Sequence, residues 1–437
     1  MSSAAEAERR LAAAGQEDAV AWLRGLEPAP RERLARQILG IDFALLRRLH
    51  AGERTEPLAA GPLEEPPFVE AGRTEGMREA RQAGEEALRA GQVAFVLVAG
   101  GQASRLRWPG PKGTYPIGAR SKRSLFQLLA ERIVRAGRRY GTTPPLAVTT
   151  SEGTDEEIRA FFRRHDDFAL GDGTLAFAAQ GELPALDNAG QLLLTERDRL
   201  FTSPDGHGGA LKAVASAGLL STWAERGILS VCTFQVDNPL LPVVDPTFLG
   251  HFALSGAPLA AKVMLKQEPG EKVGVVVLCR GRPRIIEYSE LTPEQAAATT
   301  PSGALAFRLG SIAVHLFDLA FLERELGIGL PYHVARRDVP CLDARGNRTV
   351  RTVRKFEQFI FDLFPRADRI ALLEVLRERE FAPLKNAEGP DSAATVREAL
   401  DREVRRWYAE AGVAPPHAGP LELSPLEAEG PEDLLQS

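Results

Sequence analysis

Four short segments hold the residues best suited to chemistry. In VAFVLVAGGQASRLRWPGPKG, an apolar run leads directly to Gly100 and Gly101, and then to Arg105 and Lys112. Glycines behind a strand let backbone N–H groups approach a phosphate closely, and the two cations could neutralise a polyphosphate. The segment matches neither GxxxxGK[ST] nor GxGxxG. The alternative is a glycine turn with incidental basic residues.

The second segment is FQVDNPL, in which an apolar run ends at Asp237. A carboxylate at the carboxyl end of a strand can hold Mg2+, which prefers oxygen ligands and bridges to substrate phosphates. The alternative is an ordinary aspartate at the junction of a strand and a turn.

Two further segments read as loops. SPDGHGGALKA has too many glycines for a packed helix interior, which predicts a close-approach loop leading into a helix with His207 at its apex. FAPLKNAEG places Lys385 in a loop closed by a proline. A solvent-exposed turn histidine and a surface lysine are the respective alternatives.

Lysine is scarce in this chain. Lysine and arginine total 54, yet only eight are lysine: residues 112, 122, 212, 262, 266, 272, 355 and 385. A lysine offers a compact ammonium to phosphate oxygens, whereas arginine offers a wide planar fork. Each lysine is therefore a better functional candidate than usual, with codon drift as the alternative.

The elements that must position these residues change in type along the chain. Residues 1–90 carry apolar residues at helical spacing, interrupted by the proline-rich stretch EPLAAGPLEEPPFVE. From Val93 onward, short apolar runs alternate with helical segments, which predicts an α/β fold with helices on both faces of the sheet. The later runs arrive more densely and suggest an added mixed or antiparallel sheet. We expect a helical N-terminal region (1–90), a catalytic domain (91–340) and a small C-terminal region (341–437) ending in a loose acidic tail.

Composition excludes several classes of protein. The 437 residues are 44% hydrophobic, enough for a sizeable core, and the net charge of −5 argues against nucleic acid as the main partner. No apolar run approaches the length of a membrane span, and the charged N-terminus does not resemble a signal peptide. Three scattered cysteines and seven histidines form no disulfide framework and no zinc spacing. These features favour a cytoplasmic protein with no membrane partner.

Several short motifs follow one another over roughly residues 90–400. They are LVAGGQASRL, SLFQLLAERI, QGELPAL, SPDGHGG, QVDN, EKVGVVV, IIEYSE, YHVA, KFEQFIFDLF and EVLREREFAPLKNA. In this order the chain resembles the eukaryotic-type UDP-sugar pyrophosphorylases, in particular the UDP-N-acetylglucosamine enzymes. The resemblance implies a Rossmann-like, GT-A-like nucleotidyltransferase core: a mixed sheet with flanking helices.

The resemblance also implies roles for individual residues. Arg105, Lys112 and Lys385 would be catalytic, and Asp237 would bind Mg2+ between phosphates. The nucleotide would contact Val98, Ala99, Gly100, Gly101, Lys112, Gln180, Gly206, Asp237 and Lys355, with Gln180 and Gly206 facing the uracil. The sugar would contact His207, Gly274, Glu287, Ser311 and Lys385.

The chain departs from the family pattern at two places. The family's glycine loop reads LxGGxGTRLG. This chain has Ala103 at its third glycine, Ser104 at its threonine and Arg107 at its final glycine. His207 and Ser311 stand where the acetylglucosamine enzymes carry asparagine, and UDP-glucose enzymes typically carry histidine at the first of these. The second pair of changes leaves the reaction type intact and opens the choice of sugar.

The resulting expectation is a uridylyltransferase: UTP plus a hexose 1-phosphate gives a UDP-hexose plus pyrophosphate. The sugar would be N-acetylglucosamine 1-phosphate or glucose 1-phosphate. One alternative is a non-catalytic UDP-sugar-binding regulator on the same fold, which the altered glycine loop makes thinkable. A dinucleotide-dependent oxidoreductase is disfavoured, because the chain lacks GxGxxG and the acidic ribose-binding residue that follows it.

Overall fold

A computed structural model describes residues 2–52, 62–101, 103–288, 290–343 and 346–435. Residues 56–61 of the expected proline-rich connector lie outside these ranges. The chain divides into two compact units. Unit 1 comprises Met1–Pro57, Gln180–Gly209 and Leu330–Ile360, and unit 2 comprises Leu58–Ala179, Ala210–Gly329 and Phe361–Ser437. These units group residues by contact, and the division of the sequence at residues 90 and 340 stays a prediction.

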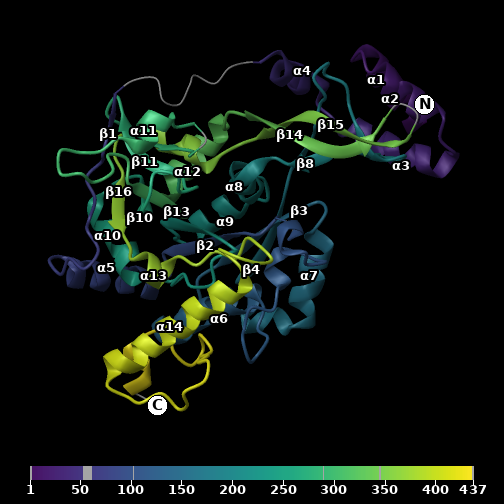
Figure 1. Cartoon of the computed structure of the whole chain (residues 1–437). Coiled ribbons are helices and arrows are strands. Elements are labelled where there is room, and N and C mark those ends of the chain that lie inside the picture. Colours follow the sequence, from purple (N-terminus) through teal and green to yellow (C-terminus); the bar gives the residue numbers. More distant parts are fainter. Residues whose placement is uncertain (1, 53–61, 102, 289, 344–345, 436–437) are drawn as a thin grey trace. The chain divides into compact units, whose positions relative to one another are not determined.

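Unit 2 is built on one large mixed sheet (Figure 1), in which the described residues form ten strands. The main path runs β1-β11-β13-β9-β2-β3-β4; β10 pairs with β13 and β16, and β12 pairs with β11. The strands are β1 (Leu63–Glu64), β2 (Val93–Val98), β3 (Leu146–Ser151), β4 (Leu175–Gln180), β9 (Ser230–Gln235), β10 (Leu259–Leu265), β11 (Val275–Cys279), β12 (Arg282–Ile286), β13 (Leu309–Asp318) and β16 (Ala371–Glu374).

The centre of this sheet is parallel, as the apolar runs predict. β2 pairs in parallel with both β3 and β9, and every residue of β2 is buried. A strand covered on both faces needs a continuous apolar run, which VAFVLV supplies. The α/β prediction is confirmed. The prediction of an added sheet from the later runs is wrong: β10, β11, β12 and β13 pair antiparallel within the central sheet.

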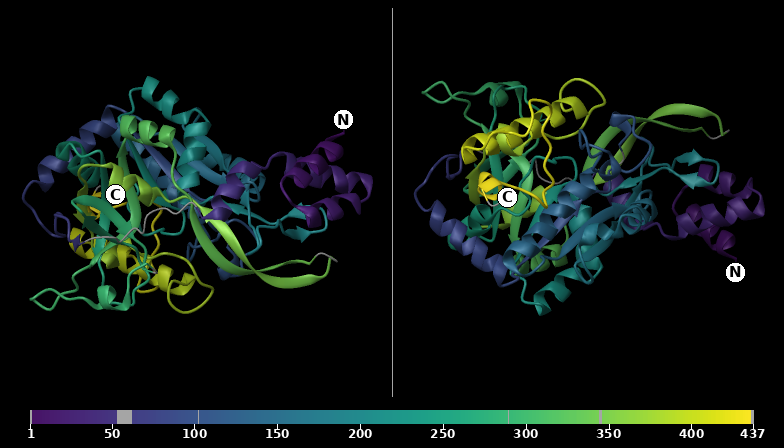
Figure 2. Two further views of the ribbon diagram at one scale, coloured as in Figure 1. Left: turned by 90° about the horizontal axis from the view of Figure 1, so that it is seen from above. Right: turned by 90° about the horizontal axis from the view of Figure 1, so that it is seen from below.

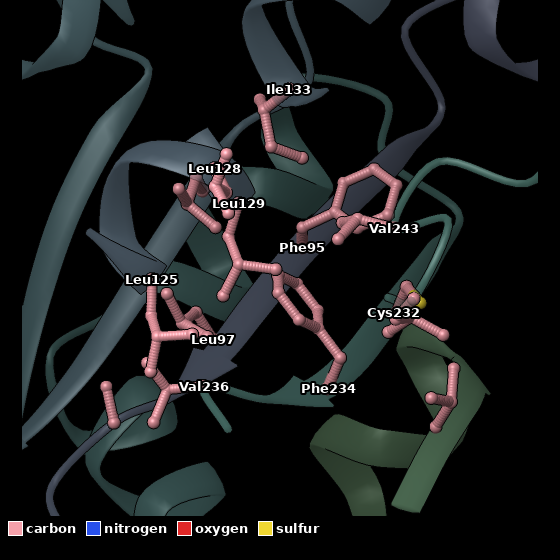
Figure 3. Close-up of a cluster of buried hydrophobic side chains, with 14 of the residues drawn as sticks. Phe95, Leu97, Leu125, Leu128, Leu129, Ile133, Cys232, Phe234, Val236 and Val243 are labelled. Atoms are coloured by element: carbon pink, nitrogen blue, oxygen red, sulfur yellow. The ribbon is translucent and has the colours of Figure 1, made fainter. Parts of the chain in front are cut away.

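The core of unit 2 lies between the central strands and the helix α6 (Leu125–Tyr140) (Figure 3). Phe95 of β2 and Phe234 of β9 meet edge to face, with ring centroids 6.4 Å apart. Leu129 and Ile133 of α6 belong to the same buried cluster. The packing fixes the carboxyl ends of β2 and β9, where the candidate site residues follow.

The remaining helices of unit 2 surround this sheet. Two of them cross at glycines: a Cβ on Gly250 of α10 would lie 1.6 Å from the carbonyl oxygen of Ala80 in α5. Only glycine permits so close an approach of two backbones. The helices are α5 (Met77–Arg89), α7 (Asp155–Arg164), α9 (Leu219–Glu225), α10 (Pro246–Ser255), α11 (Pro293–Ala297), α12 (Leu319–Ile328), α13 (Arg377–Glu380) and α14 (Ala393–Ala411), with 3₁₀ turns at Ser104–Leu106, Lys112–Thr114, Asp166–Ala169, Ile360–Arg366 and Pro431–Leu435.

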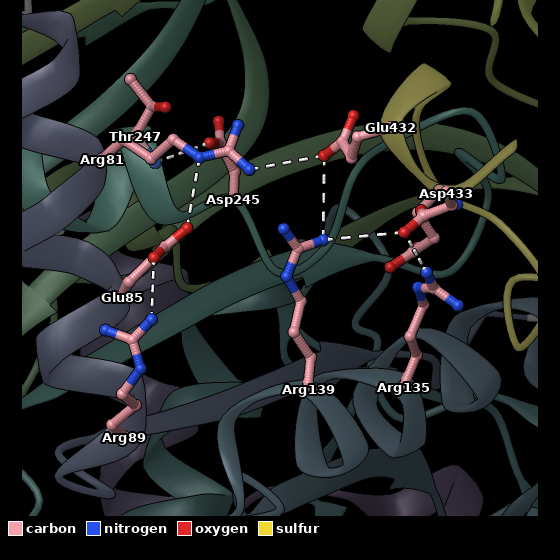
Figure 4. Close-up of polar contacts among 10 residues, drawn as sticks. Arg81, Glu85, Arg89, Arg135, Arg139, Asp245, Thr247, Glu432 and Asp433 are labelled. Carbon is pink, nitrogen blue, oxygen red and sulfur yellow. Dashed lines mark hydrogen bonds and ion pairs between the residues drawn. The ribbon is translucent and has the colours of Figure 1, made fainter. Parts of the chain in front are cut away.

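The described part of the acidic C-terminal segment is docked on unit 2, so the prediction of a loose tail is wrong. Leu421, Ser424 and Ala428 are buried. The Glu429 carboxylate pairs with Arg132 of α6 at 2.9 Å. Figure 4 shows the pair one turn later in the helix, between Asp433 and Arg135. The prediction rested on the proline-rich, acidic composition of the segment. In the structure, arginines of a distant helix pair with two of its carboxylates.

Unit 1 combines short helices with two small sheets. The helices are α1 (Ser3–Ala13), α2 (Glu17–Arg24), α3 (Pro28–Leu39) and α4 (Phe43–Ala51), with the first residues of α8 (Gly206–Ser216). The strands are β5 (Glu182–Pro184), β6 (Leu194–Glu196), β7 (Arg199–Leu200), β8 (Thr202–Pro204), β14 (His333–Leu342) and β15 (Arg348–Glu357). β14 and β15 pair antiparallel along their full length as a long twisted ribbon (Figure 2).

No helix in the described ranges is both long enough and apolar enough to cross a membrane.

Candidate active site

The glycine loop follows β2 at the carboxyl edge of the central sheet. The Val236 N–H donates to the Val98 carbonyl at 3.2 Å, which holds the ends of β9 and β2 together. Ala99 and Gly100 are buried, whereas Gly101 is exposed and has open space where a Cβ would stand. The Lys112 N–H donates to the Gly101 carbonyl at 3.4 Å, so the loop folds back on itself.

Lys112 and Asp237 meet at this edge. The Lys112 Nζ lies 3.3 Å from the Asp237 Oδ2, and their side chains are 15% and 21% exposed. Asp237 comes two residues after the end of β9, at the strand mouth and outside the core. The pair therefore presents one cation and one carboxylate at a surface that a substrate can reach.

The loop that carries Lys385 joins the same edge. The Leu384 N–H donates to the Asp237 carbonyl at 2.7 Å, and the Ala387 N–H donates to the Arg105 carbonyl at 3.2 Å. Arg105 is exposed, while Lys385 is half-buried with its Nζ 5.7 Å from the ring centroid of Phe381. The structure thus brings all three predicted catalytic residues and Asp237 to one edge of unit 2.

The predicted sugar contacts of unit 2 lie on or directly beside paired strands: Gly274 precedes β11, Glu287 follows β12 and Ser311 lies on β13. The Ser311 N–H donates to the Gly274 carbonyl at 2.8 Å, and a Cβ on Gly274 would lie 3.5 Å from the Glu287 Oε1. Burial raises the pKa of Glu287, with a further contribution from Glu290, while the positive charge of Lys385 acts in the opposite direction. Gly274, Glu287 and Ser311 therefore form one group, and the charge of Lys385 reaches it.

The altered glycine loop has visible consequences. Ala103 is buried, and its carbonyl accepts from the Leu106 N–H at 3.0 Å. Arg107, which replaces the last glycine of the family pattern, has φ of 54°. Arg107 thus adopts a left-handed conformation that glycine would adopt without strain, and an arginine in it costs roughly 1 kcal/mol.

The other predicted nucleotide contacts belong to unit 1. The buried Gln180 donates through Nε2 to the Gly206 carbonyl at 3.3 Å. Gly206 has φ of 85°, and a Cβ there would lie 2.4 Å from the Gln358 carbonyl oxygen. On β15, the Lys355 Nζ lies 5.3 Å from the ring centroid of Phe201, a cation–π contact.

His207 has a fixed orientation within unit 1. It lies in the first turn of α8, so the prediction of a loop apex is wrong. Its Nδ1 accepts from the Ile360 N–H at 2.9 Å, and its ring stacks on Phe359 at 5.2 Å. Burial, together with the charge of His333, lowers the pKa of His207 to about 4. The imidazole is therefore neutral, with its hydrogen on Nε2, and offers a donor there.

Asp237 suits a magnesium ion shared with phosphates. No group of three or more histidine, cysteine, aspartate or glutamate side chains with metal-binding geometry occurs among the residues that the structure describes. Mg2+ commonly takes one or two protein carboxylates and completes its shell with phosphate oxygens and water. The Asp237 carboxylate beside the ammonium of Lys112 fits that pattern.

Sequence reasoning missed Asn238, whose buried side chain bonds to the segment before Lys385. Its place directly after Asp237 was the available signal. Sequence reasoning also missed Phe359, whose ring stacks on that of His207, and His333, whose ring stacks on Phe359 with the centroids 4.6 Å apart. His333 lies in the matched motif YHVA, to which no role had been given, and Phe359 lies in KFEQF, of which only Lys355 had been given one.

Comparisons with known proteins show the family of this chain. The human UDP-N-acetylhexosamine pyrophosphorylase-like protein 1 is 37% identical over 100% of this chain and 96% of its own length. UDP-N-acetylglucosamine diphosphorylase 2 of Arabidopsis thaliana is 37% identical over 97% of this chain and 90% of its own. The crystal structure of uridine diphosphate N-acetylglucosamine pyrophosphorylase from Trypanosoma brucei, solved with an inhibitor, superimposes with a TM-score of 0.84 at 28% identity, covering 100% of this chain and 95% of that one. A family model described as UTP–glucose-1-phosphate uridylyltransferase matches residues 46–390, and this chain belongs to that family.

Proposed function

We propose that this protein transfers the uridylyl group of UTP to N-acetylglucosamine 1-phosphate, releasing pyrophosphate, and that it also uses glucose 1-phosphate. One observation carries the proposal: Arg105, Lys112, Asp237 and the Lys385 loop meet at the carboxyl edge of a nucleotidyltransferase sheet. Ligands of open α/β sheets bind at this edge. Membership of the uridylyltransferase family supports the reaction type.

The reaction is a displacement at phosphorus. A phosphate oxygen of the sugar 1-phosphate attacks the α-phosphorus of UTP and forms a new P–O bond. The bond from that phosphorus to the oxygen bridging the β-phosphorus breaks, and pyrophosphate leaves with its electron pair. No covalent intermediate with the enzyme is needed.

The residues of this edge then contribute alignment and charge. Lys112 binds the UTP phosphates, and its contact with Asp237 holds the ammonium in place before substrate arrives. Lys385 neutralises the sugar phosphate, while Arg105 faces solvent where charge develops on the leaving pyrophosphate. Mg2+ bound through Asp237 would supply further neutralisation of the phosphate oxygens.

The sugar is a separate part of the proposal. The relatives named for N-acetylglucosamine support the acetylated sugar. His207 and Ser311 replace the asparagines of that branch, and contacts at the site decide specificity more directly than the rest of the chain. Serine is shorter than asparagine, and a neutral histidine with its hydrogen on Nε2 donates only through that nitrogen. With these residues the site makes fewer contacts that only an acetamido group can satisfy than it would with two asparagines.

The test is pyrophosphate release by the purified protein with UTP, Mg2+ and a panel of sugar 1-phosphates. We expect turnover with both sugars at comparable kcat/KM. A protein that binds UDP-sugar without turnover would instead be the regulator. A preference above about a hundredfold, roughly 2.7 kcal/mol, for either sugar would refute the relaxed specificity.

We also propose a reducing, cytoplasmic location. Cys232, Cys279 and Cys341 are all free, buried thiols. Thiols stay reduced in the cytosol, whereas disulfides form and persist in oxidising compartments. Fractionation of cells with an antibody against the protein tests this, and recovery in a secretory fraction would contradict it.

A further inference from the structure

Asn238 is a buried amide at the edge of the candidate site, and the proposed reaction gives it no task. It follows Asp237 directly and is 3% exposed. Its Nδ2 donates to the Glu380 carbonyl at 2.7 Å, and its Oδ1 accepts from the Ala382 N–H at 3.1 Å. Both ends of the Asn238 amide therefore hydrogen-bond to the backbone of residues 380–382.

The neighbouring backbone adds a third bond to the same segment. The Leu384 N–H donates to the Asp237 carbonyl at 2.7 Å. Residues 237 and 238 thus hold residues 380–384 at three points, and Lys385 is the next residue along the chain. Residues 381–384 belong to no strand and so make no strand-to-strand hydrogen bonds. The three bonds to residues 237 and 238 hold them in place instead.

The far end of the segment is anchored in the core. The Glu380 carboxylate lies 2.6 Å from the Nζ of Lys262, and that Nζ lies 2.7 Å from Asp245. Lys262 is 1% exposed on β10. A compact ammonium fits between two carboxylates at such a buried point. The segment held by Asn238 therefore starts from a fixed position.

We propose that Asn238 is a positioning residue that fixes Lys385 relative to Asp237, so that the sugar phosphate bound by Lys385 meets the nucleotide phosphates beside Asp237. This inference rests on the proposed function, which gives Lys385 its phosphate. The backbone of residue 385 sets where the lysine side chain starts, so a shift of residues 380–384 would displace the ammonium from the reacting group. Misplacement by about 1 Å can cost about a hundredfold in rate.

The test is a double-mutant cycle with Asn238→Ala, Lys385→Ala and the double variant, assayed by pyrophosphate release. Asn238→Ala should lower kcat by about a hundredfold and leave the KM for UTP within about threefold. The double variant should be within about threefold of Lys385→Ala alone, because a residue that acts through Lys385 has nothing left to position. Losses that multiply independently would overturn the proposal.

Gln16 provides a matched control. It is also a buried amide that bonds backbone at two points, donating to the Gly190 carbonyl at 2.9 Å and accepting from the Leu192 N–H at 2.8 Å. Gln16→Ala should lower the melting temperature and leave kcat unchanged. A kcat loss in Gln16→Ala equal to that in Asn238→Ala would show that the effect is one of general stability, and would overturn the proposal.

Two further measurements keep the outcomes separate. UTP affinity by calorimetry reports whether Asn238→Ala is folded; if it is not, Asn238→Asp keeps the oxygen that accepts from Ala382 and takes its place in the cycle. A wild-type protein without turnover would refute the proposed function itself. Full turnover in Lys385→Ala would refute the role of that lysine and with it the positioning role of Asn238. An impaired Lys385→Ala with independent losses refutes the positioning role alone.

Discussion

Replacing Lys112 with alanine should damage turnover far more than folding. Its Nζ lies 3.3 Å from Asp237 and both side chains are mostly covered, so the ammonium is held in place before substrate binds. Loss of one preorganised charge contact costs about 2–4 kcal/mol of transition-state stabilisation, or about 30- to 900-fold in kcat/KM. The ion pair itself keeps some exposure to water, so its loss should cost the fold only about 1 kcal/mol.

The assay is steady-state pyrophosphate release with UTP and the sugar 1-phosphate varied in turn. The loss should fall chiefly on kcat/KM for UTP. Lys122 is the control: it is exposed, and its Nζ donates only to the nearby Ala119 carbonyl at 3.1 Å among the bonds described. Equal damage from Lys122→Ala, or a Lys112→Ala enzyme within about threefold of wild type, would refute the phosphate role of Lys112.

The remaining predictions concern metal, sugar, pH and packing. Asp237→Ala should abolish Mg2+-dependent turnover while circular dichroism shows a folded protein; near-normal activity would refute the metal assignment. His207→Asn should shift the kcat/KM ratio toward N-acetylglucosamine 1-phosphate, and an unchanged ratio would remove His207 from the sugar site. Burial raises the pKa of the Glu429 carboxyl to about 7. The folded state therefore binds this proton more tightly than the unfolded chain, and the resulting stability is complete below about pH 4.5 and is lost as the pH rises through 7. Glu429→Gln should flatten the dependence of Tm on pH between 5 and 8. Gly250→Ala would force two helix backbones apart and should cost about 1–3 kcal/mol by chemical denaturation, whereas Gly327→Ala, in open space within α12, should cost nothing.

The sequence by itself determined the features written in consecutive residues. The run VAFVLV is followed by Ala99 and Gly100, and the structure shows a fully buried strand that ends at Val98. Asp237 follows a second apolar run and lies at the mouth of β9. Such features are readable because a strand that is buried on both faces requires a continuous run of apolar residues.

Tertiary structure decided which distant segments meet. Nothing near Lys385 in the sequence indicates that Leu384 bonds to Asp237 or that Asn238 holds the preceding residues. The same is true of the ion pair that docks Glu429 on Arg132 and of the Ile360 N–H that fixes the His207 tautomer. In each case a polar group is satisfied by a partner far along the chain. The local sequence indicates which polar groups need a hydrogen-bond partner once they are buried. Only the folded chain determines which residue that partner is.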